Sequence, residues 1–143
     1  MLRGVDEPEM RRRVTAARSA RLATVDERGR PHLVPVCYVL LGETAYSAVD
    51  HKPKRGTRLR RLANVEATGV ACLLVDEYAE DWSSLWWVRL DGRGRVVAEP
   101  DEAAAAVAAL VAKYPQYAER PPTGPVLAVD VTRWTGWTGR SPT

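Results

Sequence analysis

Hydrophobic and polar residues alternate with a period of two along much of the chain, as they do on the two faces of a β-strand. Residues 70–75 instead form an unbroken apolar run, which predicts a strand that is buried on both faces. Gly92 and Gly94 predict a bulge within a later strand, which either continues past it or restarts. The pattern predicts six strands, at residues 20–25, 32–41, 44–49, 70–75, 85–98 and 126–133.

Helical periodicity predicts three helices, at residues 7–18, 54–68 and 100–114. Pro8 and Pro100 fit the first turns of two of them, because a missing backbone N–H is harmless there. Four prolines among residues 115–125 predict a loop before the last strand.

Short turns join most of the predicted strands. Gly42 and Glu43 separate the second and third strands, so a hairpin is expected there. Pro35 lacks an N–H for the strand ladder, which predicts an edge, a bulge or a position facing a ligand. This order favours a mainly β protein, an antiparallel sheet or small barrel with added helices, over parallel β-α-β winding. The length of 143 residues suits a single domain spanning residues 1–143.

Composition excludes several classes of protein. Hydrophobic residues make up 45% of the chain and the net charge is only +3, which is not the composition of a disordered protein. No apolar stretch is long enough to span a membrane, and no apolar run near the N-terminus marks a secretory signal. Cys37 and Cys72 are expected to be buried free thiols in a reducing compartment, so the sequence predicts a cytoplasmic protein.

Basic charge is concentrated in residues 51–61, which carry six lysines and arginines and no acid. The rest of the chain has 15 basic against 18 acidic residues, so a nucleic-acid partner is not expected. The segment joins a predicted strand to the start of a predicted helix, where free N–H groups favour anions. A helix from residue 54 would place Arg55 and Arg58 beside its apolar stripe. The basic segment has two interpretations: it binds a phosphate or polycarboxylate group, or it is a solvated cationic start of a helix.

Tryptophans form the second notable feature. Trp86 and Trp87 must point to opposite faces of their strand, and Arg89 shares the face of Trp87. This pair suits a flat anionic ring system, although packing on both sides of a sheet explains the tryptophans equally well. Trp134 and Trp137 supply either a lid or a cap for the barrel. No dinucleotide-binding, phosphate-loop, zinc-binding or serine-hydrolase motif is present, so any chemistry is expected to come from a cofactor.

These segments together resemble a known family. The matching segments are residues 21–25, 29–36, 45–55, 59–65 and 74–82, together with EYAEDWSSLWWVR at residues 77–89. They look like the pyridoxamine-phosphate-oxidase-like superfamily of split β-barrel flavoproteins, and within it the actinobacterial branch of F420-dependent oxidoreductases. The likeness runs from about residue 15 to Trp137. It implies a six-stranded antiparallel split β-barrel that forms a homodimer.

The resemblance also implies a cofactor site at the dimer interface and hydride transfer to a conjugated small-molecule acceptor. The long cationic segment favours coenzyme F420 over FMN; an FMN enzyme of the same fold and a non-catalytic cofactor-binding protein are the alternatives. No catalytic residue is assigned: His51 and Tyr46 are the candidate proton donors, but solvent or substrate is expected to supply the proton. The implied cofactor-binding residues are Val34, Pro35, Val36, Ser47, Ala48, Lys52, Lys54, Arg55 and Arg58, with Trp87, Arg89 and Trp137 contributed by the partner subunit.

Overall fold

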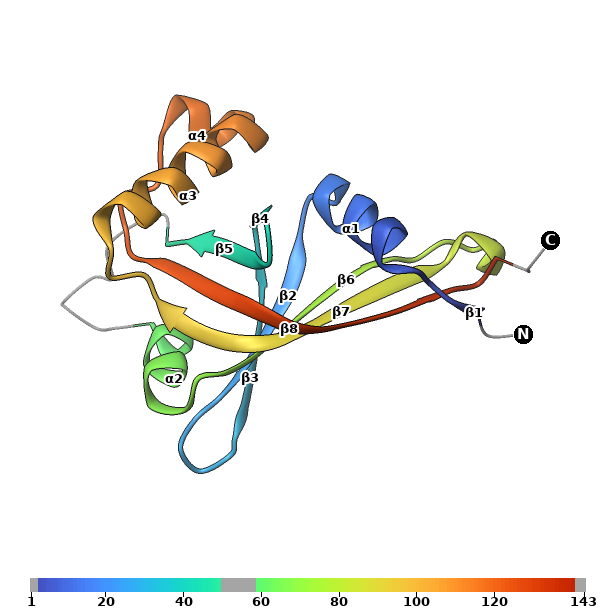
Figure 1. Ribbon diagram of the computed structural model, residues 1–143, viewed down its shortest axis with the longest axis horizontal. Coiled ribbons are helices and arrows are strands. Elements are labelled where there is room, and N and C mark those ends of the chain that lie inside the picture. The colour runs from blue at the N-terminus through green and yellow to red at the C-terminus, as the bar shows by residue number, and fades with distance from the viewer. Residues whose placement is uncertain (1–2, 50–58, 141–143) are drawn as a thin grey trace.

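The computed structural model describes residues 3–49 and 59–140, and these residues form one curled sheet with helices around its edges (Figure 1). The helices are α1 (Glu7–Ala16), α2 (Arg60–Thr68), α3 (Pro100–Lys113) and α4 (Pro115–Glu119), with a short 3-10 helix, η2, at Trp82–Ser84. The strands are β1 (Arg3–Gly4), β2 (Ala20–Val25), β3 (Pro31–Val36), β4 (Val39–Leu41), β5 (Thr44–Ala48), β6 (Val70–Glu77), β7 (Trp86–Val96) and β8 (Val126–Thr138).

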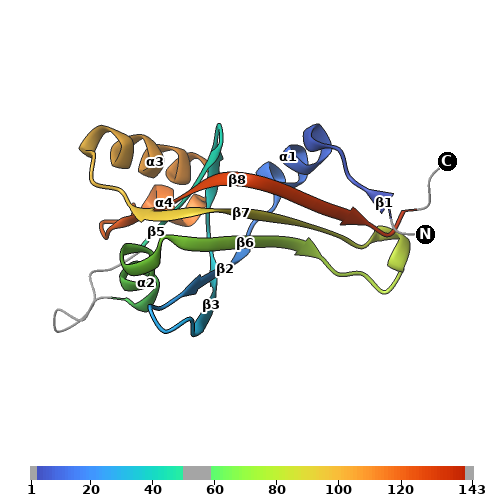
Figure 2. The ribbon, with the colours of Figure 1, turned by 60° about the horizontal axis from the view of Figure 1, so that its bottom comes forward.

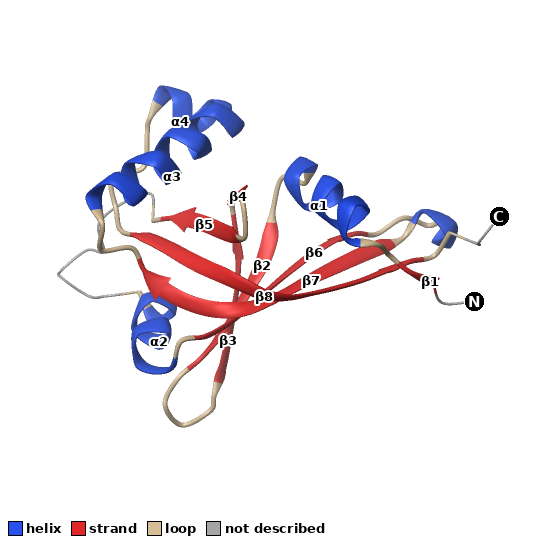
Figure 3. Cartoon of the chain, viewed as in Figure 1, coloured by secondary structure: helices blue, strands red, loops and turns tan. Residues whose placement is uncertain are grey.

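All strand pairs are antiparallel, and the strands follow the order β3-β2-β6-β7-β8-β5-β4, with β1 added beside β8. The sheet bends into a half-barrel, and the helices are arranged around it (Figures 2 and 3). The expectation of a mainly β, antiparallel protein with added helices is therefore confirmed.

The expected number of six strands is too low for the described residues, whose sheet has eight. The predicted strand at residues 32–41 is two strands, because the ladder is interrupted at Tyr38. The backbone N–H of Tyr38 donates to the Tyr114 hydroxyl at 3.1 Å, and the Tyr38 hydroxyl donates to the carbonyl of Val14. The first half pairs with β2, and only the second half forms the predicted hairpin, β4-β5, around Gly42 at φ +61°.

Pro35 lies on β3, which ends the strand order at one edge of the sheet, so the expectation of an edge position is met. The predicted glycine bulge also exists. Strand β7 runs unbroken past Gly92, and its register with β8 shifts between Asp91 and Gly92. Strand β8 extends to Thr138, five residues beyond the predicted end at residue 133.

The helices differ from prediction at their ends. Helix α2 begins at Arg60 rather than residue 54, because Leu59 has extended backbone (φ −61°, ψ 142°). The predicted helical placement of Arg55 and Arg58 lies outside the described residues. Helix α1 ends two residues early, and the proline-rich segment predicted as a loop contains α4.

Two hydrophobic clusters lie on opposite faces of the sheet. The larger packs α1 and α2 against the inner face, around residues such as Leu22 and Val88. The smaller packs α3 against the outer face of β5 and β8, through Ala106 and Leu110. Helix α3 covers only that end of the outer face, and α2, which contacts β2 and β6, packs into the inner cluster through Leu62 and Val65. The uncovered rest of the outer face carries the candidate site.

Candidate functional site

The uncovered outer face is organised in rows of paired residues that cross the sheet. One row contains Pro35, Arg21, Leu74, Arg89 and Thr135, each a register partner of the next. The adjacent row contains Asp76, Trp87 and Trp137. Because paired residues of neighbouring strands share a face, these side chains all lie on one surface.

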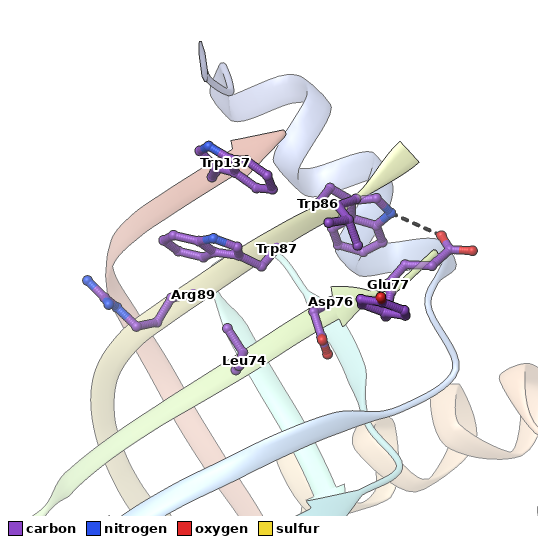
Figure 4. Close-up of a pocket in the computed structure, with 9 residues that line it drawn as sticks. Leu74, Asp76, Glu77, Trp86, Trp87, Arg89 and Trp137 are labelled. Atoms are coloured by element: carbon purple, nitrogen blue, oxygen red, sulfur yellow. Dashed lines mark hydrogen bonds between the residues drawn. The ribbon is translucent and has the colours of Figure 1, made fainter. Parts of the chain in front are cut away.

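A cleft of about 320 Å³ opens on this surface near the ends of β6, β7 and β8 (Figure 4). Trp87 and Trp137 lie side by side, with Arg89 and Leu74 below them in the view. Trp86 reaches the edge of the cleft from the inner face, where its Nε1 donates to Glu77 at 3.0 Å. The complete lining is Leu74, Asp76, Glu77, Tyr78, Leu85, Trp86, Trp87, Arg89 and Trp137. The volume falls within the range of small-molecule sites.

The cleft combines aromatic faces with charged groups of both signs, Arg89 on one side and the carboxylates of Asp76 and Glu77 on the other. The guanidinium carbon of Arg89 lies 5.8 Å from the centre of the Trp87 ring, and its Nε is 3.3 Å from Asp91 Oδ2. The buried Nε1 of Trp137 has no hydrogen-bond partner among the described residues. A buried donor without a partner is costly, so it favours a ligand that supplies an acceptor.

Cys72 lies on the same face, one row from Leu74. Burial, and then the negative charge of Asp91, raise the pKa of Cys72 to about 11. The thiol therefore stays protonated at neutral pH.

Among the residues predicted to bind the cofactor, the structure brings Trp87, Arg89 and Trp137 together in one cleft. Pro35 lies on the same face but outside the cleft. Val34, Val36, Ser47 and Ala48 are elsewhere: Val34 and Val36 pack on the inner cluster, Ser47 is buried, and Ala48 packs under α3. Lys52, Lys54, Arg55 and Arg58, with His51, lie outside the described residues.

Leu74, Asp76 and Tyr78 also line the cleft, although no sequence motif indicates them as site residues. Their signal is the pairing of residues 70–77 with 86–93. In that register Asp76 pairs with Trp87 and Leu74 pairs with Arg89, so the register places these residues in the cleft.

Within residues 3–49 and 59–140, no cluster of histidine, cysteine, aspartate or glutamate could hold a metal ion. None of the helices in that part of the chain has the length and apolar composition of a membrane crossing.

Solved structures share this fold at low sequence identity. A conserved hypothetical protein from Mycobacterium tuberculosis matches with a TM-score of 0.78 and 18% identity, over 97% of this chain and 90% of its own. An FAD-binding protein from Mesorhizobium loti matches with a TM-score of 0.73 and 18% identity, over 96% of both chains. The heme storage protein HutZ from Vibrio cholerae matches with a TM-score of 0.69 and 17% identity, over 92% of this chain and 93% of its own.

No curated protein matches the sequence. The family model of pyridoxamine 5'-phosphate oxidase, in contrast, matches residues 6–138, which is nearly the whole chain. That match includes every strand of the sheet except β1, as well as the residues of the cleft. The chain therefore belongs to the pyridoxamine 5'-phosphate oxidase family.

Proposed function

We propose that this protein is an oxidoreductase that binds the deazaflavin coenzyme F420 and delivers hydride to a conjugated small-molecule acceptor. The observation that supports this proposal is the cleft in which Trp87, Trp137 and Arg89 meet on an uncovered sheet face. A flat ring system can stack on the indoles, and a guanidinium beside them favours a ring that carries negative charge.

The residues present fit such a ring. The unpaired Nε1 of Trp137 is a donor for a ring carbonyl, and Leu74 gives the cleft an apolar wall. When bound, a deazaflavin or flavin ring supplies the hydride chemistry. The chain's own contribution is to stack, orient and charge-match the ring, and to exclude water from one side of it. No described side chain in the cleft is assigned as a proton donor, so solvent or substrate supplies the proton.

We further propose that two copies of the chain pair through the uncovered outer face. Leu33 is 66% exposed, Val70 52% and Leu74 36%, all on this face. Contiguous exposed apolar surface of this kind marks an interaction site. In such a dimer, Pro35 of one subunit and the cleft of the other form one site, to which Val34, Val36, Ser47 and Ala48 contribute through their backbone, because their side chains pack inside the subunit. We propose that the phosphate or carboxylate groups of the cofactor are held by Lys52, Lys54, Arg55 and Arg58. We also propose that the protein acts in the cytoplasm.

A flavin is the second candidate ligand. A protein of the same fold from Mesorhizobium loti is an FAD-binding protein, and FMN offers the same ring with less negative charge in its tail. A cofactor-holding protein without turnover is the third candidate, since the fold is also that of a heme storage protein.

Titration of the purified full-length protein with F420, FMN and FAD separates these candidates. We expect saturable binding of F420, weakened about tenfold by Arg89→Ala, because a charged contact is lost. Arg120→Ala is the matched control, since this exposed arginine follows α4 and does not line the cleft, and it should leave affinity unchanged. The double variant Lys54→Ala, Arg55→Ala should weaken binding without lowering the melting temperature.

The outcomes differ for each candidate. If the protein binds FMN or FAD but not F420, the cofactor is a flavin and the F420 proposal is wrong. If the protein binds F420 tightly but reduces no quinone or enone in a panel, it is a cofactor-binding protein without turnover. If the Arg89→Ala variant binds the cofactor as tightly as the Arg120→Ala control does, the cleft is not part of the cofactor site.

A further inference from the structure

A second groove lies on the inner side of the sheet, between α1 and the ends of β6, β7 and β8. Its volume is about 300 Å³. Trp86 and Glu77 line both this groove and the aromatic cleft, so their side chains lie between the two. Its remaining lining is polar and comes from α1, η2 and the end of β8: Arg13, Ser83, Ser84, Thr138 and Arg140.

Arg13 carries the clearest sign of a ligand. Its guanidinium carbon lies 5.0 Å from the centre of the Trp86 ring, and Nη2 contacts Glu9 at 3.2 Å. The buried Nε of Arg13, however, has no hydrogen-bond partner among the described residues. A buried, charged donor of this kind costs free energy unless an acceptor reaches it.

Two further donors line the groove without a partner. The side chains of Arg140 and Ser84 make no hydrogen bond or ion pair within the part of the chain that the structure describes. Ser83 differs, because its hydroxyl donates to Asp81 at 2.7 Å. The unpaired donors therefore come from three elements and converge on one hollow.

The acids at the groove do not satisfy these donors. Glu77 is the carboxylate in its lining, and it accepts the Nε1 hydrogen of Trp86 at 3.0 Å. Arg13 keeps its ion pair with Glu9 at one end of its guanidinium, while Arg140 has no acid partner among the described residues. A planar fork of guanidinium N–H groups matches the paired oxygens of a carboxylate or a phosphate.

We propose that this groove is a binding site for the carboxylate or phosphate group of a small anion, separate from the aromatic cleft. Arg13 and Arg140 bind the anionic oxygens, and Ser84 donates a third hydrogen bond. The proposal does not depend on the cofactor, because none of these three residues lines the cleft.

The test is a titration of the cofactor-free, full-length protein, followed by nuclear magnetic resonance of its arginine Nε–H groups. Sodium phosphate and sodium benzoate are added separately at constant pH and at ionic strength matched with sodium chloride. The Arg13 resonance is identified by its loss in Arg13→Lys. We expect one of the two anions to shift it saturably, and Arg140→Ala to weaken that binding about tenfold.

Arg140→Ala changes an exposed side chain near the end of β8, so folding should be retained. Arg28→Ala, in the exposed turn between β2 and β3, is the control for loss of one positive charge and should leave the affinity unchanged. Saturation by phosphate or by benzoate identifies the source of the anionic group. A shift that never saturates, equal affinities in the Arg140→Ala and Arg28→Ala variants, or shifts confined to the indoles of Trp87 and Trp137 would each overturn the proposal.

Discussion

Arg95 joins one helix and two strands through two carboxylates. Its guanidinium donates to Glu102 at 2.8 and 2.6 Å, and to Asp130 at 2.7 and 3.1 Å. The Tyr46 hydroxyl also donates to Glu102, at 2.6 Å. Glu102 lies in the first turn of α3, so this network attaches the start of that helix to the sheet.

The network makes folding stability depend on pH. The hydrogen bonds from Arg95, and then from Tyr46, lower the pKa of Glu102 from 4.5 to about 2. A lowered carboxyl pKa stabilises the fold above the unfolded value, and this stabilisation is lost as the pH falls from about 5 towards about 2. We expect Glu102→Gln to cost about 1 kcal/mol at neutral pH, a value reduced for partial exposure.

Urea unfolding at several pH values checks this expectation. The wild-type protein should lose more unfolding free energy between about pH 6 and pH 3 than Glu102→Gln does, because only the wild type has this carboxylate to protonate. Glu119→Gln, on α4, is the control and should follow the wild type. Parallel pH curves for the wild type and Glu102→Gln would contradict the assigned role.

Individual residues could be predicted from the sequence where strand periodicity alone decides their direction. The shared face of Trp87 and Arg89 is such a case, since the two residues are separated by one position in the same strand. The network of Arg95 could not be predicted, because Asp130 is 35 positions away and the bulged register of β7 and β8 brings it close. The same limit applies to Arg13 and Arg140, which meet only after the sheet has formed.

At the level of elements, the close approach of β7 and β8 at their bulge requires a glycine. A Cβ added to Gly92 would lie 2.2 Å from the carbonyl oxygen of Asp130, which is backbone and cannot rotate away. We therefore expect Gly92→Ala to destabilise the protein by about 2 kcal/mol or more, through overpacking.

Denaturant unfolding of Gly92→Ala measures this cost. Gly4→Ala is the control, because a Cβ at Gly4 meets nothing within 4 Å, and its unfolding free energy should change little. Equal stabilities of the two variants would show that the sheet relaxes at the bulge without cost.

Most elements were predicted by periodicity, and the errors arise where something other than periodicity decides the structure. The break at Tyr38 is set by a hydrogen-bond partner distant in sequence, Tyr114. The late start of α2 is set by the extended backbone of Leu59. The alternating apolar residues at 32–41 carry no sign that Tyr114, between α3 and α4, binds the backbone N–H of Tyr38 in the middle of the segment. The two-residue β1 was missed because it is too short to show a period, and its pairing with β8 defines it.

For the whole molecule, the faces of the sheet differ in a way that no single element reveals. Helices α1 and α2 cover the inner face, and α3 covers one end of the outer face. The rest of the outer face carries exposed leucine and valine next to the aromatic cleft. The proposed pairing with a second copy would cover this apolar surface on both subunits, because a two-fold symmetric contact uses the same face of each.

Replacing Leu74 at the centre of this face tests the proposed dimer and its site together. We expect light scattering to give a dimeric mass for the wild type and a monomeric mass for Leu74→Asp, because a buried, unpaired carboxylate is costly. Leu41→Asp is the matched control, since Leu41 is 40% exposed against 36% for Leu74 but lies on β4, beside α3. The monomeric variant should also lose cofactor affinity, because Leu74 lines the cleft itself and because the proposed site is completed by the second subunit. A folded, monomeric Leu74→Asp that binds cofactor like the Leu41→Asp control would show that a single subunit holds the complete site.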